Sequence, residues 1–489
     1  MKSLASFVPF LILAAALAVG PSLVRATGLA AAPQQPPDRS VAPKPGPVPA
    51  LKLPAIHKRT LSNGLPVWIV ELHKVPVVHV TLVVKSGSGA DPRGKYGIAN
   101  LTAEMLDEGA GKRNALQIAD AVDYLGASLS TSSTPDASFV ELHVSVARLG
   151  DGLPVMADVT QRPTFPQEEL QRVREDLLTS LVEARDDPAS LIRFAFPRLV
   201  FGAQHRYGTL SVGTAAALKG FNVADLRQFH AQQYVPSNAA LVVTGDVTAA
   251  SAVARLETAF GAWKGTPPPA SSVPAAAQLT TRQIYLIDKP GAAQSQIRIG
   301  WVGVPRSTPD YFALRVLNTI LGGSFTSRLN QNLREEHGYS YGATSTFDMR
   351  SAAGPFYAAA GVQTDKTSEA LTEFFKELEA IRKPIPPEEI EKARNYLALL
   401  MPRSFETTES LAGSLAQMIV YNLPPDYYAT YTERVRAVTP ADVQRAAERY
   451  IQPDKFAVVI VGDRKVIEPG IKALNLGPIK TVEIDEVMK

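Results

Sequence analysis

The sequence predicts an α+β protein made of two copies of one domain, and two internal repeats support this prediction. Residues 224–246 recur as residues 441–463, and both stretches contain Ala-Asp, a Tyr, a Pro and an apolar run that ends in Gly-Asp. Residues 165–170, Phe-Pro-Gln-Glu-Glu-Leu, recur as residues 385–390, Ile-Pro-Pro-Glu-Glu-Ile. The two offsets, 217 and 220 residues, agree closely, as expected for a tandem duplication.

The first half is expected to span residues 54–264 and the second residues 279–489, joined by a Pro- and Ala-rich linker over residues 265–278. Asn63-Gly64 precedes an apolar run and predicts a hairpin turn. Alternation of apolar residues predicts a pair of strands over residues 127–134 and 137–146, and apolar stretches predict strands over residues 77–84 and 239–244. Helices are expected over residues 97–106, 115–125, 151–160, 168–186 and 225–234.

The N-terminus has the pattern of a secretory signal peptide over residues 1–26. Lys2 precedes an apolar run over residues 7–19, which is short for a membrane span, and Val24-Arg25-Ala26 fits a cleavage site. An uncleaved N-terminal anchor is the alternative. Residues 27–53 are rich in Pro and predict an extended tether. We therefore expect an exported protein, most simply in a bacterial periplasm, without a stable membrane span after cleavage.

The amino-acid composition of the chain argues against several classes of function. The 489 residues are 45% hydrophobic and 20% charged with a formal net charge of +3, which is typical of a soluble globular protein. No cluster of basic residues interleaved with aromatic residues is present, which argues against a nucleic-acid partner. The absence of Cys excludes disulfides and a Cys-linked lipid anchor. No G-x-S-x-G or Walker motif supports a serine-hydrolase or nucleotide-binding function.

The stretch from Asp91 through the helix at residues 97–106 to Gly109 resembles the metal motif of the pitrilysin/insulinase family of zinc peptidases. That family has H-x-x-E-H on a helix, where two His bind zinc and the Glu accepts a proton from the bound water. By this resemblance Asn100 replaces the first His, Ala103 the catalytic Glu and Glu104 the second His. Alternatively, the stretch is an ordinary amphipathic helix that never bound metal.

The resemblance also places the third zinc ligand, and it is absent too. In the family this ligand is a Glu on a later helix, and the matching position here is Ser180. We therefore expect this chain to bind no zinc itself, with zinc held by the partner subunit, and to have no catalytic residue of its own at the motif.

The seven histidines give no helical metal motif, because no pair has the i, i+3 or i, i+4 spacing. His79 and His143 fall within predicted strands and are expected to be satisfied core or edge residues, although a site assembled from distant residues is left open. The histidines are His57, His73, His79, His143, His205, His230 and His337.

The second half keeps a different family feature, an Arg and a Tyr seven residues apart. Arg334 and Tyr341 match this pair within Leu-Arg-Glu-Glu-His-Gly-Tyr-Ser-Tyr at residues 333–341, which follows Leu-Gly-Gly-Ser-Phe at residues 321–325. In the family the pair faces the zinc across the cavity, where a guanidinium and a phenol can donate hydrogen bonds to a substrate carbonyl. The alternative is a surface ion pair for Arg334 with Glu335 or Glu336, and a core position for Tyr341.

The resemblance extends over roughly residues 55–475 and implies a clam-shell pair of pitrilysin-type domains, each an antiparallel-rich sheet covered by helices. It implies a non-catalytic subunit of a heterodimeric peptidase, in which a homologous partner carries zinc and this chain supplies Arg334 and Tyr341. Short unfolded peptides would be the substrates. A scaffold or peptide-binding protein without proteolytic function is the alternative, and the sequence leaves the partner, its stoichiometry and the cleavage preference open.

Overall fold

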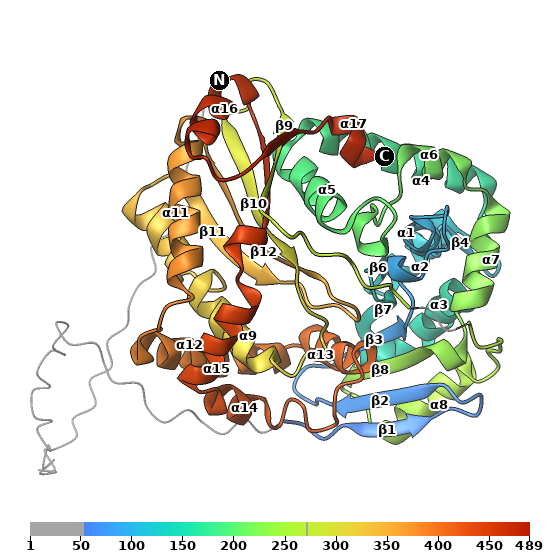
Figure 1. Cartoon of the computed structure of the whole chain (residues 1–489). Coiled ribbons are helices and arrows are strands. Elements are labelled where there is room, and N and C mark those ends of the chain that lie inside the picture. The colour runs from blue at the N-terminus through green and yellow to red at the C-terminus, as the bar shows by residue number, and fades with distance from the viewer. Residues whose placement is uncertain (1–52, 270–271) are drawn as a thin grey trace, which may run out of the picture. The chain divides into compact units, whose positions relative to one another are not determined.

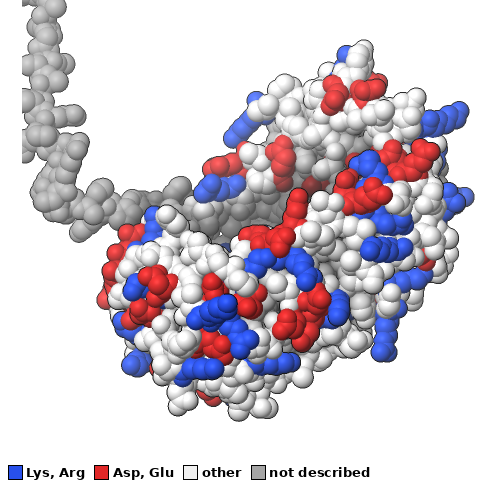
Figure 2. All heavy atoms as spheres, turned by 90° about the horizontal axis from the view of Figure 1, so that it is seen from above, with Lys and Arg blue, Asp and Glu red and all other residues white. Residues whose placement is uncertain are grey.

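The computed structural model (Figure 1) describes residues 53–269 and 272–489, and it contains two six-stranded sheets with helices around them. The predicted signal peptide and nearly all of the predicted tether lie outside the described residues. Within the described part of the chain, no helix is long and apolar enough to cross a membrane. Figure 2 shows acidic and basic side chains interspersed over the visible face, without an extended basic surface.

The first sheet has the strand order β1-β2-β8-β3-β7-β6, with β2 and β8 parallel and the other pairs antiparallel. The predicted hairpin joins β1 to β2, and Gly64 in its turn has φ +85°. All four further strands predicted in this half are present, with ends within two residues of the predicted ones. The strands are β1 His57–Thr60, β2 Pro66–Glu71, β3 Val77–Val84, β6 Ser128–Ser133, β7 Ser138–Ser145 and β8 Ala239–Gly245.

The helices of the first half include all five that the sequence predicted and three that it did not, namely α5, α6 and α8. A short hairpin, β4 Gly109–Ala110 with β5 Arg113–Asn114, follows the first helix. The helices are α1 Ile98–Glu104, α2 Ala115–Tyr124, α3 Leu149–Gln161, α4 Gln167–Asp186, α5 Pro188–Phe201, α6 Ala215–Gly220, α7 Val223–Gln233 and α8 Ala249–Phe260.

The second sheet repeats the topology of the first and confirms the duplicated α+β fold. Its order, β14-β9-β13-β10-β12-β11, matches the first sheet strand for strand, and β9 and β13 are parallel as β2 and β8 are. Only the edge strand differs, because β14 runs parallel to β9. The strands are β9 Gln283–Asp288, β10 Gln294–Val302, β11 Ser340–Phe347, β12 Pro355–Gln363, β13 Ala457–Gly462 and β14 Ile479–Thr481.

The second half is likewise covered by helices, and the described residues between α8 and β9 form no helix or strand. A π-helical turn over Gln331–Glu336 follows α10 directly. The helices are α9 Tyr311–Leu321, α10 Arg328–Asn330, α11 Thr367–Ala380, α12 Pro387–Leu400, α13 Thr408–Val420, α14 Tyr431–Ala437, α15 Pro440–Tyr450, α16 Arg464–Ala473 and α17 Ile484–Met488.

The two halves exchange one helix each. Helix α5 of the first half packs on β10 and β13 of the second, and α13 of the second half packs on β3 and β8 of the first (Figure 1). Leu191 of α5 shares a core with Val459 and Val461, whereas Leu411 of α13 shares a core with Val83 and Val242. Each half therefore completes the apolar core of the other, and the described residues form one compact unit.

Candidate functional site

The start of α1 is fixed by a buried carboxylate and a close backbone contact. The Asp91 carboxylate accepts hydrogen bonds from the backbone N–H groups of Gly97, at 2.6 Å, and Ala99, at 3.0 Å. Gly97 has φ +100°, and a Cβ there would lie 2.5 Å from the Cα of Gly213, so only glycine fits. Burial raises the pKa of Asp91 to about 7, while these two hydrogen bonds and the charge of Arg206 act to lower it.

Helix α1 carries the motif positions, and their side chains do not suit zinc. Ala103 is buried and has no donor atom. Asn100 is half-buried, and its amide nitrogen Nδ2 is buried without a hydrogen-bond partner. Glu104 is exposed and offers the single carboxylate, whose pKa is raised by partial burial and by the nearby Glu108. One carboxylate and one amide do not provide the His and carboxylate ligands of a catalytic zinc site.

Helix α4 carries the third motif position, Ser180, which is exposed to solvent. Arg172 on the same helix forms ion pairs with Glu108, beyond the end of α1, and with Glu169 and Asp176 on α4. A guanidinium therefore neutralises the acidic groups between α1 and α4. No group of three metal-binding side chains forms at the motif positions among the residues that the structure describes.

Arg334 lies in the π-helical turn and Tyr341 on the following strand, β11. Arg334 is in the π-helical turn, where its guanidinium stacks on the ring of Phe325 at 4.6 Å and its Nε lies 3.4 Å from a Glu335 carboxylate oxygen. Asn330 donates to the carbonyl of Phe325 and accepts from the N–H of Ala343. The Asn330 side chain therefore links the Phe325 loop to β11 through two hydrogen bonds.

The side chain of Tyr341 is largely exposed to solvent. It is 90% exposed and lies where the pairing of β11 with β12 shifts in register between Ser340 and Ala343. The turn before it contains Gly338 at φ +65°. The alternative core position for Tyr341 is therefore wrong, whereas the alternative ion pair of Arg334 with Glu335 is present. Single-turn π-helices recur at functional sites, which fits this location.

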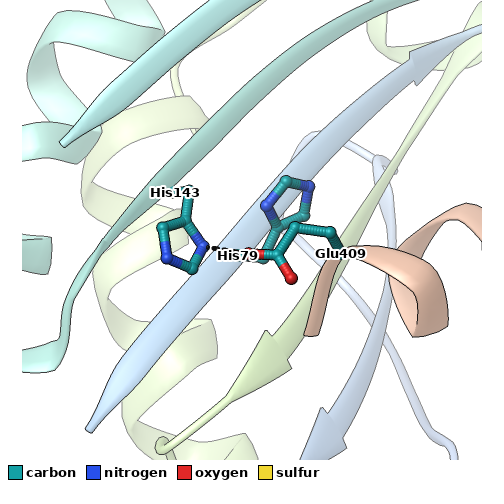
Figure 3. Close-up of side chains that lie close together, drawn as sticks. All are labelled: His79, His143 and Glu409. Atoms are coloured by element: carbon teal, nitrogen blue, oxygen red, sulfur yellow. Dashed lines mark ion pairs between the residues drawn. The ribbon is translucent and has the colours of Figure 1, made fainter. Parts of the chain in front are cut away.

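The sequence missed a third group of residues, which the fold brings together across the two halves. His79 on β3 and His143 on β7 are direct cross-strand partners, and Glu409 at the start of α13 approaches them (Figure 3). The His143 Nδ1 lies 2.7 Å from a Glu409 carboxylate oxygen. His79 is buried as expected but not satisfied, because neither ring nitrogen has a hydrogen-bond partner.

The described residues contain only this one group of three metal-binding side chains with ligand atoms within 4.8 Å of one another. The one sequence signal was the presence of a histidine on each of two neighbouring predicted strands. Without the strand register, that signal does not show that the two rings face each other.

Two adjoining segments of the chain match models of one peptidase family. Residues 67–199 match the insulinase domain of peptidase family M16, and residues 220–397 match the peptidase M16 inactive domain. The chain belongs to the M16 family of peptidases. The family contains the pitrilysin/insulinase enzymes that the sequence resembles, so that resemblance is confirmed.

Solved structures and curated relatives agree with the M16 assignment. A peptidase M16 inactive domain from Pseudomonas fluorescens is 26% identical, with a TM-score of 0.77 over 83% of this chain and 98% of that one. A Helicobacter pylori protease, 22% identical, shares the fold with a TM-score of 0.77 over 84% of this chain and 100% of that one. An uncharacterized zinc protease of Rickettsia bellii is 24% identical over 82% of this chain and 96% of its own length.

Proposed function

We propose that this M16 chain is the non-catalytic subunit of an exported two-chain peptidase. A homologous partner would supply the zinc and its H-x-x-E-H helix, and this chain would supply Arg334 and Tyr341 to bind short unfolded peptides. The match of residues 220–397 to the M16 inactive domain is compatible with pairing to an active subunit. The groups for metal chemistry are absent from α1 and α4 of this chain.

The observation that carries the proposal is the contrast between two sets of family positions. The zinc positions hold a buried Ala103, an Asn100 amide and an exposed Ser180, none of which can replace the lost ligands. The donor positions hold both groups, with Tyr341 90% exposed and Arg334 anchored on Phe325.

The chemistry proposed for the pair is stabilisation of negative charge. When a hydroxide attacks a peptide carbonyl, the carbonyl oxygen gains negative charge and needs hydrogen-bond donors fixed close to it. The Tyr341 hydroxyl and the Arg334 guanidinium are such donors. The Phe325 ring limits the motion of the Arg334 guanidinium, and the Asn330 amide fixes the start of β11 at Ala343, two residues from Tyr341.

The test uses the complex with the zinc-bearing partner. Tyr341→Phe removes only the hydroxyl, and we expect kcat for peptide cleavage to fall by about 10²–10³-fold with the complex intact by size exclusion. Tyr124→Phe is the matched control, because Tyr124 is 79% exposed and lies outside the proposed site. Arg334→Lys keeps the charge but loses the planar fork and is expected to reduce kcat as well. Unchanged turnover in both test variants would refute the proposal.

A scaffold or peptide-binding role without proteolysis is the second candidate, and the contacts of Arg334 favour it. The guanidinium already stacks on Phe325 and pairs with Glu335, as a purely structural arginine would. In that case Arg334→Lys should weaken assembly of the complex, while Tyr341→Phe should change neither assembly nor turnover.

Export is the remaining part of the proposal, and it rests on the N-terminal sequence. We expect the secreted or periplasmic form to begin at Thr27, after cleavage at Val24-Arg25-Ala26. N-terminal sequencing of the protein purified from the periplasm of an expressing bacterium checks this. An intact N-terminus on a membrane-bound protein would indicate the uncleaved anchor instead.

A further inference from the structure

We propose that His79, His143 and Glu409 form a metal site that binds one divalent zinc ion between the two halves of the chain. The site lies away from the motif helix. Residues of β3 whose side chains alternate with His79, such as Val78 and Val80, pack in the same core as Leu101 of α1. The His79 side chain therefore occupies the opposite face of the first sheet, the face covered by α13.

The backbone already places the ligands. His79 and His143 are opposed across the antiparallel β3–β7 pair, with ring centroids 5.9 Å apart. The ligand atoms of the two rings and of Glu409 all lie within 4.8 Å of one another. A tetrahedral zinc with bonds of about 2.0–2.1 Å needs its ligand atoms about 3.3 Å apart. Small side-chain rotations therefore suffice, without a change in strand register.

The burial of His79 is the observation that indicates a ligand. Its side chain is 7% exposed, and both ring nitrogens are buried without a hydrogen-bond partner. Leaving buried polar atoms without a hydrogen-bond partner destabilises the folded state. A neutral imidazole that coordinates zinc through one nitrogen would have that atom satisfied.

Glu141 would provide a fourth ligand after its carboxylate moves closer, because it lies outside the group whose ligand atoms are within 4.8 Å of one another. One of its carboxylate oxygens lies 3.6 Å from the Nε2 of His79 and accepts a hydrogen bond from Thr81. Two neutral imidazoles and two carboxylates carry a charge of −2, which one zinc ion balances. Four protein ligands make a closed site of the structural kind, which leaves no open position for a reacting water.

A bound metal would link helix α13 of the second half to the first sheet. Glu409 is in the first turn of this helix, and the preceding Thr408 accepts a hydrogen bond from Thr244 of β8 at 2.8 Å. A zinc ion joining Glu409 to His79 and His143 would add a link between α13 and two strands of the other half. We expect zinc to raise the stability of the whole chain by binding the folded state selectively.

The test titrates zinc into the full mature chain after removal of metal with EDTA. Competition with a chromophoric chelator gives the stoichiometry and Kd, and Co²⁺ substitution gives an absorption spectrum that reports tetrahedral coordination by nitrogen and oxygen. We expect one zinc per chain. Because even the loss of a supporting contact weakens metal sites by about 10–100-fold, His143→Ala and Glu409→Gln should each raise Kd by at least about 100-fold.

The control variant is His73→Ala. His73 also lies beside carboxylates, at 2.7 Å from Asp246 and 3.5 Å from Glu71, but it is more exposed than His143. Its loss should leave zinc affinity and the zinc-dependent rise in Tm unchanged. Zinc binding that survives both test variants, or that disappears with His73→Ala, would overturn the proposal. So would the absence of stoichiometric binding by the wild type. Neither result depends on a partner subunit or on peptide cleavage.

Discussion

The two sheets pair their central strands in the same way, but they carry different side chains at one set of register partners. In the first sheet Thr244, His79 and His143 are consecutive register partners across β8, β3 and β7. In the second sheet the equivalent strands pair Val461, Gln296 and Gly361. A Cβ on Gly361 would lie 2.7 Å from the amide nitrogen of Gln296, so the Gln296 side chain fills the space of the second ring.

The exchanged helices α13 and α5 also differ in the side chain that lies beside these register partners. Glu409 begins α13, whereas the repeat offset of 220 places Ala189 at the equivalent position of α5. The fold therefore tolerates both a cluster of metal-binding groups and a set of uncharged residues at this junction. Since the architecture does not require the two histidines, their presence in one half calls for a separate explanation, and metal binding provides one.

The largest effect is expected from restoring the lost motif of the first half. Ala103 is buried, so Ala103→Glu places a carboxylate in the core and should lower the free energy of unfolding by about 3–5 kcal/mol without zinc. The fourfold variant with Asn100→His, Glu104→His and Ser180→Glu should bind zinc at α1 and recover part of that loss. Thermal denaturation with and without zinc measures both effects.

The control for the restored motif omits Ser180→Glu. Two histidines without a third ligand bind zinc weakly, so this threefold variant should show little recovery. Equal recovery in the threefold and fourfold variants would show that Ser180 is not the third ligand position. Both variants need His143→Ala in the background, so that zinc at the proposed interdomain site does not contribute.

A matched pair of core variants tests whether the exchanged helices are equivalent. Leu191 of α5 and Leu411 of α13 are both buried and are related by the repeat offset. Leu191→Ala and Leu411→Ala should each lower the free energy of unfolding by about 2–5 kcal/mol. Urea unfolding followed by tryptophan fluorescence and by circular dichroism should give one shared transition in each variant. Two separate transitions would show that the halves unfold independently despite the exchange.

The smallest effect concerns the acids that precede the first helix of each half. Asp310 in the second half is paired with Arg445 and Arg449, at 3.3 and 3.4 Å, and accepts from the Tyr450 hydroxyl. Asp91 forms no ion pair within the described residues, and burial raises its pKa to about 7. An acid with a raised folded pKa destabilises the fold once ionised, so its penalty is absent below about pH 4 and grows as the pH rises towards 7.

The expected pH effect is a loss of about 1.4 kcal/mol in the free energy of unfolding for each pH unit within that window. Asp91→Asn cannot ionise, so the wild type should lose stability relative to this variant between pH 5 and pH 6. Urea unfolding of both proteins at each pH measures the difference, which cancels the contributions of other groups. A difference that does not change with pH would mean that Asp91 is already ionised at pH 5, held by the N–H groups of Gly97 and Ala99.

Local sequence patterns predicted most of the first sheet but not the exchange. Strands β6 and β7 follow from apolar alternation, and β3 and β8 follow from apolar stretches of the sequence. The predicted replacement of the zinc ligands came from the resemblance of the α1 segment to the family motif. Helix α5 was missed because it contains Pro197 and is apolar on several faces, so it lacks a simple amphipathic period. Its partner surface belongs to the other half, which no local pattern reveals.

The candidate site could likewise be predicted only in part from the sequence. Arg334 and Tyr341 were predicted from the family resemblance, whose Arg–Tyr spacing they match, whereas the exposure of Tyr341 accompanies the irregular pairing of β11. The interdomain cluster required both the β3–β7 register and the position of α13. Register is set by the pairing of whole strands, and helix position by the packing of the two halves, so neither could be derived from residues 79, 143 and 409 themselves.

The exchange of α5 and α13 changes what the linker has to do. A protease cut at the exposed Lys264, before the linker, would produce two polypeptides, each of which keeps a helix buried in the other's core. Covalent continuity is then unnecessary for cohesion once folding is complete, and the nicked protein should migrate as a single species until a denaturant is added. The linker matters earlier, when it keeps the two halves at a high effective concentration while each still lacks its missing helix.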